Sequence, residues 1–296
     1  MIVDRIEDYI RGNYTPTPEQ FALADAMSEE RGRREREMFN GFFVDMGLDD
    51  EERPGVSGSS PFWCYRRLQY GETKVAKEPP APRALLAWYM GRGVESMVQR
   101  LIVLTQTNVV WPKLIDGKLV EKEVTLDTPY GPVSGHVDLV MDIKDQEIPV
   151  EIKSSATFGW KKIRGTRTVD DLFGHYTQLQ FYIHAMKAPG GIYVSVAKET
   201  GHSCEVHLDK DNETLREIMT ACARLKTNLE AGSIAPHHDW ALKTKRTKEF
   251  PGYEQLASIR CGYCAWTAGC HNGVARTTNA RKQPVWLRKI EEEATK

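Results

Sequence analysis

Apolar and polar residues alternate along two neighbouring stretches in the middle of the chain. The alternating apolar positions are Val137, Leu139, Met141 and Ile143 in the first stretch, and Ile148, Val150 and Ile152 in the second. A period of two is typical of a β-strand with one buried face. The residues between the stretches, 144–147, are polar, as expected of a turn. We therefore predict a hairpin of two half-buried strands.

Helical periodicity dominates on both sides of this hairpin. Helices are expected over about 1–49, 84–102, 172–186 and 212–231. Further strands are expected at 191–197 and 204–208. Asp170 or Asp171 can cap the third of these helices. Helices and strands in this order predict an α/β fold, with a mixed central sheet flanked by helices.

The length and charge of the chain restrict its organisation. A chain of 296 residues can bury a sizeable core in one large domain with appendages. We expect an N-terminal helical extension at 1–50, a core at 59–240 and a C-terminal region at 241–296. The net charge of -1 gives no overall basic field, so any affinity for nucleic acid must come from local patches. No apolar run is long enough for a membrane span, and we expect a cytoplasmic protein.

The predicted hairpin carries two carboxylates and an amine. Glu151 and Lys153 are two residues apart, so they share the strand face opposite Ile152. An antiparallel partner can bring Asp138 beside them. Carboxylate oxygens are the ligands that Mg2+ and Mn2+ prefer, and Lys153 can reach a water or the charge that develops on a phosphate. Solvated strand residues or a surface ion pair are the alternative, because 27% of the chain is charged.

Two of the predicted helices add candidate residues. Glu95 lies beside the apolar stripe of 84–102, where a carboxylate at the edge of the core needs a partner. An ordinary solvated glutamate is the alternative. Gln178 and Tyr182 are four residues apart, so they project from one helix face and can hold a phosphate or orient a water. Helix–sheet packing with a satisfied amide is the alternative for this pair.

Cysteines gather near the C-terminus. Cys261, Cys264 and Cys270 fall within ten residues, and Cys64 is the N-terminal cysteine that can supply a fourth ligand. Such a group indicates a metal site. Four thiolates suit either Zn2+ or an iron-sulfur cluster, and spacing alone does not decide between them.

Two basic runs are candidate nucleic-acid contacts. One run follows the predicted hairpin and consists of Trp160, Lys161 and Lys162. The other lies near two aromatic residues in the C-terminal region and contains Lys243, Lys245 and Arg246. Aromatic rings can stack on bases while the cations follow the backbone of a single strand. A solvated linker is the alternative for the second run.

These residues together resemble the PD-(D/E)XK nuclease superfamily. The resemblance is to the RecB-type branch, which includes the AddB nuclease domain and the CRISPR-adaptation nucleases with a four-cysteine 4Fe-4S cluster, and it runs from about Ser59 to Cys270. The positions that match the family's motifs, in order, are Gly91 and Glu95, Gly135 and Asp138, Glu151 to Lys153, and Gln178 with Tyr182. The positions that match the cluster ligands are Cys64, Cys261, Cys264 and Cys270.

The chain departs from the family pattern at two positions. The first motif often carries His where this chain has Glu95, and Val137 replaces the proline of the family's name. Glu95 still offers an oxygen ligand in place of the imidazole nitrogen. Neither change removes a catalytic group.

The resemblance implies a restriction-endonuclease-like core and a C-terminal region tied down by a metal cluster. It also implies a Mg2+- or Mn2+-dependent exonuclease on single-stranded DNA ends, in repair, recombination or end processing. The backbone carbonyl of Ile152 is an implied metal ligand, with Glu95, Asp138 and Glu151. The sequence has no Walker-type phosphate loop, so a helicase or recombination partner would act in trans.

Two other classes of function stay open at this point. One is a nucleic-acid-binding scaffold in which a metal cluster orders the C-terminus and the nuclease centre is catalytically weak. The other is a zinc-stabilised interaction protein, which would be colourless when purified. A metal-dependent cleavage assay tests the first class, and metal analysis tests the second.

Overall fold

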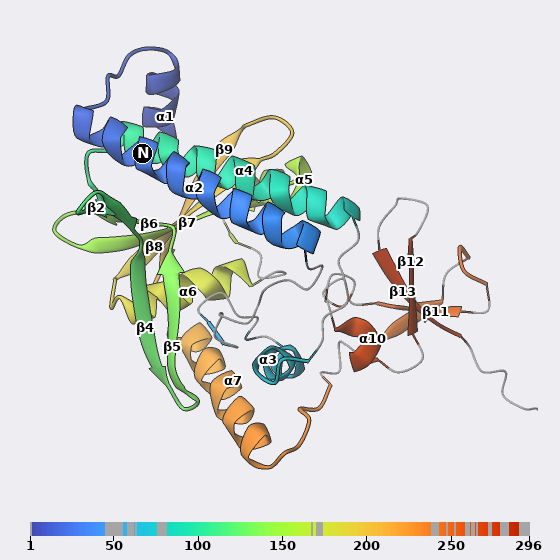
Figure 1. Ribbon diagram of the computed structural model, residues 1–296. Helices are drawn as coiled ribbons and strands as arrows, with labels where there is room; N and C mark the ends of the chain where they lie inside the picture. The colour runs from blue at the N-terminus through green and yellow to red at the C-terminus, as the bar shows by residue number, and fades with distance from the viewer. Residues whose placement is uncertain are drawn as a thin grey trace, which may run out of the picture.

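The centre of the protein is a mixed β-sheet with helices on both faces, as the sequence predicts (Figure 1). A smaller antiparallel sheet lies near the C-terminus. The computed structural model describes residues 2–44, 56–57, 62, 64–75, 82–166, 168–169, 174–237, 243–246, 248–251, 253–257, 261, 264, 266–271, 274–278 and 284–289.

Five strands form the central sheet, in the spatial order β1-β6-β7-β8-β9. They are β1 (Val109–Trp111), β6 (Leu139–Asp142), β7 (Glu147–Ser155), β8 (Gly190–Ala197) and β9 (Ser203–Asp209). Neighbouring strands are antiparallel except β7 and β8, which are parallel. A parallel pair requires a crossover connection. Here the chain crosses through two helices, α5 (Thr157–Thr166) and α6 (His175–Ala185).

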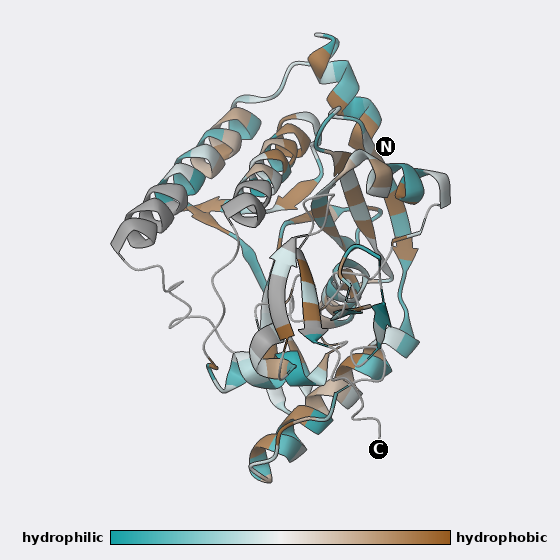
Figure 2. Ribbon diagram, turned by 90° about the vertical axis from the view of Figure 1, so that its right-hand side faces the viewer, coloured by the Kyte–Doolittle hydropathy of each residue, from teal (hydrophilic) through white to brown (hydrophobic). Residues whose placement is uncertain are grey.

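Three helices cover one face of the sheet, namely α1 (Ile2–Ile10), α2 (Pro18–Val44) and α4 (Pro82–Thr105) (Figure 1). Ile6, Met27 and Ile102 from these helices pack with Ile152 and Val194 of the sheet in one hydrophobic cluster. The N-terminal helices therefore share the core of the central sheet. Figure 2 shows hydrophobic residues along the inner strands and hydrophilic residues on the outer turns of the surrounding helices.

The other face is covered by α5, α6, α7 (Asn212–Glu230) and α3 (Tyr65–Glu72). Phe181 of α6 and Ile218 of α7 pack with Val140, while Leu179 of α6 packs with Tyr193 of β8. Because side chains alternate between the faces of a sheet, β6 sends Leu139 toward α4 and Val140 toward α6 and α7. Both faces of the sheet are therefore buried.

The predicted hairpin forms, with two corrections. Leu139 pairs with Val150 in the antiparallel β6–β7 ladder. However, the first stretch is not one strand, because Val137 ends β5 (Gly131–Val137), which pairs with β4 (Lys122–Thr128), and the chain bends at Asp138 before β6 begins. The central residues of both strands, 139–141 and 148–152, are also buried on both faces rather than on one, since helices cover both faces.

The helix that carries Gln178 begins later than the sequence pattern predicts. Helix α6 starts at His175, and its N-cap is Gly174 with a φ of 84° and no side-chain cap. Glycine tolerates this left-handed conformation at no steric cost. Asp170 and Asp171, the predicted caps, lie outside the described residues.

The remaining strands form small antiparallel units. A hairpin of β2 (Lys113–Ile115) and β3 (Lys118–Val120) follows β1. The C-terminal sheet contains β10 (Thr244–Arg246), β11 (Tyr253–Leu256), β13 (Pro284–Lys289) and β12 (Val274–Thr278) in that spatial order, and the short helix α10 (Thr267–Cys270) precedes β12. Within the part of the chain that the structure describes, no helix combines the length and apolar character needed to cross a membrane.

Candidate active site and cysteine-histidine group

Asp138 and β7 meet at the edge where the chain bends between β5 and β6. The Asp138 Oδ2 atom accepts a hydrogen bond of 2.9 Å from the backbone N–H of Ile152. On either side of Ile152, Glu151 and Lys153 form an ion pair with each other. The structure thus brings Asp138, Glu151 and Lys153 together, as the spacing of the hairpin predicts.

Glu151 and Lys153 share one face of β7, and that face is the one toward α6. The strand register places Glu151 beside Tyr193, which packs against α6. Ile152 packs in the cluster on the α4 face, opposite Glu151. A period of two along the strand accounts for this division.

Glu95 reaches β7 from the α4 face. Its Oε1 atom accepts hydrogen bonds of 2.9 Å from both the backbone N–H and the Oγ hydroxyl of Ser154. These bonds place the Glu95 carboxylate one residue beyond Lys153 along β7, on the opposite face of the sheet. We refer to Glu95, Asp138, Glu151 and Lys153 as the carboxylate centre.

A cleft of about 190 Å³ opens on the α4 side of the carboxylate centre. Glu95, Asp138 and Ile152 line it, whereas Glu151 and Lys153 do not. Residues of α2, including Met27 and Arg31, also line this cleft. The sequence pattern gave no indication of this contribution, because the N-terminal helices fall outside the family resemblance.

Burial dominates the electrostatics of the centre. Burial raises the pKa of Asp138, while the positive charge of Lys153 acts in the opposite direction. Burial, followed by the neighbouring Asp138, raises the pKa of Glu151 to about 8. Burial alone would lower the pKa of Lys153, but Glu151 and Asp138 reverse this effect and raise it. Lys153 is therefore a permanent cation beside carboxylates that are costly to ionise together.

The oxygen donors of the centre are of the kind that a hard divalent cation prefers. Glu95, Asp138 and Glu151 offer carboxylate oxygens, and Ile152 borders the cleft together with Glu95 and Asp138. The Oε2 atom of Glu151 is fully buried and has no hydrogen-bond partner among the described residues. Such an oxygen is unfavourable unless a proton or a cation compensates it. Mg2+ and Mn2+ take oxygen ligands of this kind.

The predicted pair on α6 is in contact. The Gln178 Nε2 atom donates a hydrogen bond of 3.0 Å to the hydroxyl of Tyr182. Tyr182 is 2% exposed, and burial followed by the charge of Glu151 raises its pKa. Tyr182 is therefore a neutral phenol next to the carboxylate centre, and Gln178 fixes the orientation of its hydroxyl.

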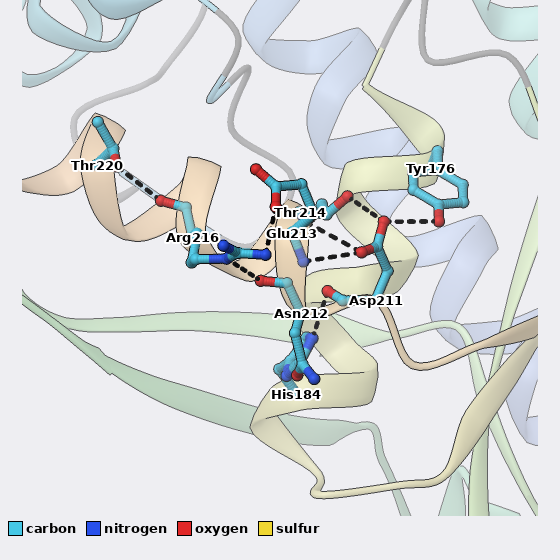
Figure 3. A network of polar contacts seen from close by, with 8 residues as sticks. All are labelled: Tyr176, His184, Asp211, Asn212, Glu213, Thr214, Arg216 and Thr220. Carbon is cyan, nitrogen blue, oxygen red and sulfur yellow. Dashed lines mark hydrogen bonds and ion pairs between the residues drawn. The ribbon is translucent and has the colours of Figure 1, made fainter.

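The position of α6 is fixed by the first turn of α7 (Figure 3). Asp211 caps α7 by accepting from the N–H groups of Glu213 and Thr214. The same carboxylate accepts a 3.0 Å hydrogen bond from the hydroxyl of Tyr176 on α6, and the Asp211 carbonyl lies 2.9 Å from Nε2 of His184. This network attaches both ends of α6 to α7, which orients Gln178 and Tyr182.

A histidine and a tyrosine near Lys153 were not anticipated from the sequence. The Tyr193 hydroxyl lies 3.3 Å from Nδ1 of His175. Burial, followed by the charge of Lys153, lowers the pKa of His175 to about 3, so this ring is neutral. No sequence signal identifies the pair, because the contact joins the start of α6 to a strand reached only after the crossover.

The predicted cysteine ligands come from distant parts of the chain. All six cysteines are free thiols. Cys64 is the N-cap of α3, and burial, with a smaller contribution from the nearby Cys264, raises the pKa of its thiol. Burial first, and then Cys64 and Cys264, raise the pKa of Cys270 to about 11. Cys261 is buried nearby, with its Sγ 3.6 Å from Nε2 of His271.

Two histidines join these cysteines, and the sequence pattern did not single them out. The candidate ligand atoms of His237, Cys270 and His271 all lie within 4.8 Å of one another. The sequence signal that could have indicated a histidine at this site is that His271 directly follows Cys270. We refer to the set Cys64, His237, Cys261, Cys264, Cys270 and His271 as the cysteine-histidine group.

The cations of both basic runs are exposed, whereas the ring of Trp160 is buried. Trp160 is 4% exposed and stacks on His202 with ring centroids 5.4 Å apart, so its ring is covered in this conformation. Lys161 and Lys162 are exposed, as are Lys243, Lys245 and Arg246 beside or on β10. The exposed aromatic side chain next to the first run is Phe158, at 83% exposure. Trp160 and Phe158 are two residues apart on α5, so they project from different sides of the helix. Trp160 faces the core and Phe158 faces solvent.

Comparisons with known proteins give a limited likeness. No protein-family model matches the sequence, and no match is found among curated proteins. Among solved structures, the chain is similar to the crystal structure of SSO0001, with 14% identity, a TM-score of 0.35, and coverage of 90% of this chain and 91% of that one.

The chain is also similar to an alkaline exonuclease, LHK-Exo, from Laribacter hongkongensis. The identity is 14% and the TM-score 0.41, over 57% of this chain and 78% of that chain. For the complex of LHK-Exo with dAMP, the identity is 15% and the TM-score 0.38 over the same shares. With identities and TM-scores this low, neither the exonuclease activity nor the nucleotide ligand is transferred from these structures to this chain.

Proposed function

We propose that this protein is a Mg2+- or Mn2+-dependent nuclease that hydrolyses phosphodiesters of DNA. The observation that carries the proposal is the meeting of Asp138, Glu151 and Lys153 around the Ile152 N–H, with Glu95 arriving from α4. Partly buried carboxylates beside a cleft, with a buried Glu151 and a fixed lysine behind them, are suited to phosphoryl chemistry, in which charge on the phosphate must be neutralised.

Each residue of the centre has a distinct role in this proposal. Asp138, Glu151, Glu95 and the carbonyl of Ile152 would hold the cation, which lowers the pKa of a coordinated water and offsets phosphate charge when bound. Lys153 keeps its proton, because its pKa is raised by the carboxylates, and therefore orients the nucleophile and stabilises negative charge rather than acting as a base. Gln178 and Tyr182 orient groups on the α6 side.

The strand of DNA approaches along α5 in this proposal. Helix α5 begins two residues after β7 ends, so its first turn lies next to Lys153 in the chain. Phe158, Lys161 and Lys162 are at helical spacings of three and four residues and share one exposed face. An exposed ring with cations on the same face can stack on an unpaired base and hold the backbone. We therefore propose single-stranded ends as the substrate, in repair, recombination or end processing.

The cysteines are proposed to hold a 4Fe-4S cluster. Their thiols come from the N-cap of α3 and from the segment around α10, and the sulfurs of Cys64, Cys264 and Cys270 interact electrostatically. Thiolates of raised pKa are costly to bury together unless a metal centre binds them. Such a centre would join α3 to the C-terminal sheet.

Cleavage of defined substrates tests the nuclease proposal. End-labelled linear DNA and closed circular DNA, each single- and double-stranded, are incubated with Mg2+, with Mn2+ or with a chelator. Wild-type protein should shorten linear single strands in the presence of metal and spare circles. Asp138→Asn should be inactive, while the matched control Asp127→Asn, at an exposed position on β4, should cleave normally. Full activity of Asp138→Asn or cleavage in chelator contradicts the proposal.

A DNA-binding scaffold is the second candidate, and one observation favours it. Glu151 and Lys153 pair with each other and do not line the cleft that Asp138 and Glu95 border. A centre closed in this way would bind DNA without cutting it. The same assay separates the two functions, because a scaffold shifts labelled single strands in a gel without shortening them in any metal.

A further inference from the structure

Helix α3 holds the loop that follows α7 through side chains next to Cys64. The Gln69 side chain accepts a 2.7 Å hydrogen bond from the N–H of Ala235 and donates a 2.6 Å bond to the carbonyl of Ser233. One turn earlier, the Nε atom of Arg66 donates to the carbonyl of Ala235 at 2.7 Å. The helix that presents Cys64 therefore also fixes the backbone just before His237.

Arg66 also determines which nitrogen of His237 carries a proton. The Nη1 atom of Arg66 lies 2.8 Å from Nε2 of His237. A guanidinium can only donate hydrogen bonds, so Nε2 must be the acceptor. A neutral imidazole with an unprotonated Nε2 carries its hydrogen on Nδ1. The His237 tautomer thus follows from a donor on a helix that is distant in sequence.

The protonated nitrogen of His237 faces a cysteine. Its Nδ1 lies 3.7 Å from the Sγ of Cys270, within reach of an N–H···S hydrogen bond. Arg66 approaches the same residue from its backbone side, since Nη1 lies 3.5 Å from the carbonyl of Cys270. Arg66, His237 and Cys270 therefore form a directed chain that ends on sulfur.

The same geometry argues against His237 as a metal ligand. The ligand atoms of His237, Cys270 and His271 lie within 4.8 Å, which by distance alone would suit a single ion. Binding through Nδ1 would require the proton of the neutral ring on Nε2, where it would oppose the donor of Arg66. His237 is thus arranged to donate to a ligand sulfur and not to replace it.

We propose that His237, held in its Nδ1–H tautomer by Arg66, is a positioning residue that donates a hydrogen bond to the Cys270 thiolate of a thiolate-bound iron-sulfur cluster. This inference rests on the cluster assigned under the proposed function. Hydrogen bonds to cluster sulfurs stabilise the thiolates and the more negative reduced state. Loss of such a supporting partner weakens metal retention about 10- to 100-fold at other sites.

Two isosteric substitutions test the position of the donor. The amide nitrogen of Asn occupies the place of Nδ1, whereas that of Gln occupies the place of Nε2. Anaerobically purified full-length wild type, His237→Asn and His237→Gln are compared for iron and sulfide per chain, visible absorbance, the rate of iron loss to a chelator, and the reduction midpoint. His207→Gln, on the exposed side of β9, controls for the substitution itself.

We expect His237→Asn to retain the wild-type behaviour and His237→Gln to lose it. His237→Gln should lose iron about tenfold faster and have its reduction equilibrium shifted about tenfold toward the oxidised form. If His237→Asn and His237→Gln behave alike in protein that contains iron, the donor role of His237 is overturned, whereas the cluster is not. If the wild-type protein contains stoichiometric zinc and both variants lose it, His237 is a metal ligand and the inference is overturned. Wild-type protein without iron refutes the cluster itself, and with it this inference, independently of cleavage activity.

Discussion

The carboxylate centre and the cysteine-histidine group gather ionisable side chains in different ways. In the centre, Asp138, Glu151 and Lys153 come from the β6–β7 hairpin and the bend before it, and Glu95 joins them from α4. Around the group, contacts such as that between Arg66 and His237 join residues 171 positions apart. A centre of the first kind follows from strand period, whereas a group of the second kind exists only after the whole core has folded.

The two regions also differ in what supports them. β7 is buried between helices on both faces, so the carboxylate centre is supported by the main hydrophobic core. Among the described residues of the C-terminal region, Leu256, Cys261 and Trp286 form a much smaller buried cluster, with Val274 packed against it. We therefore expect substitutions in the centre to change chemistry with little effect on folding, and substitutions in the group to do the reverse.

The largest effect is expected at the carboxylate centre. Glu151→Gln and Lys153→Ala should each reduce cleavage about a thousandfold or more, because the ligands and the lysine act as a unit. Binding of labelled single-stranded DNA, measured by fluorescence anisotropy, should change little. Glu123→Gln, at an exposed position on β4, is the matched control. Comparable loss of DNA binding and cleavage would show that these residues support the structure rather than the reaction.

Substitutions in the cysteine-histidine group should lower the stability of the folded protein. Cys64→Ala should lose iron and colour and lower the free energy of unfolding by about 5 kcal/mol, by the loop-closure relation used for a disulfide across a long loop. Loss of cleavage should follow indirectly, as the region after α7 loosens. Cys222→Ala, at a buried position in the α7 core, controls for loss of a thiol. An unfolding curve for Cys64→Ala that matches wild type would refute a tie between α3 and the C-terminal sheet.

Substitution of Glu95 tests whether residues on both faces of β7 contribute to one metal site. Glu95→Ala should raise the Mn2+ concentration needed for half-maximal cleavage about 10-fold, because one oxygen ligand is lost. Glu95→His should recover part of that loss, since an imidazole can also bind Mn2+. A titration of cleavage against Mn2+ measures both. If Glu95→Ala leaves the titration unchanged, the carboxylate serves only as the acceptor for Ser154.

The α6 pair should have a smaller effect than the ligands. Gln178→Ala should lower turnover about tenfold, because the amide orients the Tyr182 hydroxyl and is not itself a proposed metal ligand. Thermal unfolding, measured beside turnover, is the control. A fall in stability that parallels the fall in turnover would assign Gln178 to helix packing.

The smallest effect is expected on the surface of α5. Phe158→Ala should raise KM for single-stranded DNA a fewfold, up to about tenfold, with kcat unchanged, because stacking on one base is lost. Phe158→Trp should retain the wild-type KM. Equal KM values for all three proteins would remove α5 from the proposed DNA path.

Much of the carboxylate centre could be predicted from the sequence because its geometry is local. Alternation along a strand places Glu151 and Lys153 on one face, and helical spacing places Gln178 next to Tyr182. The mixed sheet and its flanking helices follow from the order of strand and helix patterns. Local periodicity depends on backbone geometry alone, so one sequence is enough to reveal it.

Only the tertiary structure decided which faces and which distant segments meet. The bend at Asp138 divides an apparently continuous strand between two sheets, and burial of Trp160 rather than Phe158 depends on which side of α5 meets β8 and β9. The approach of Arg66 to His237 depends on packing between α3 and the end of α7. Such contacts are selected by burial of apolar surface over the whole core, a property that no short stretch of sequence contains.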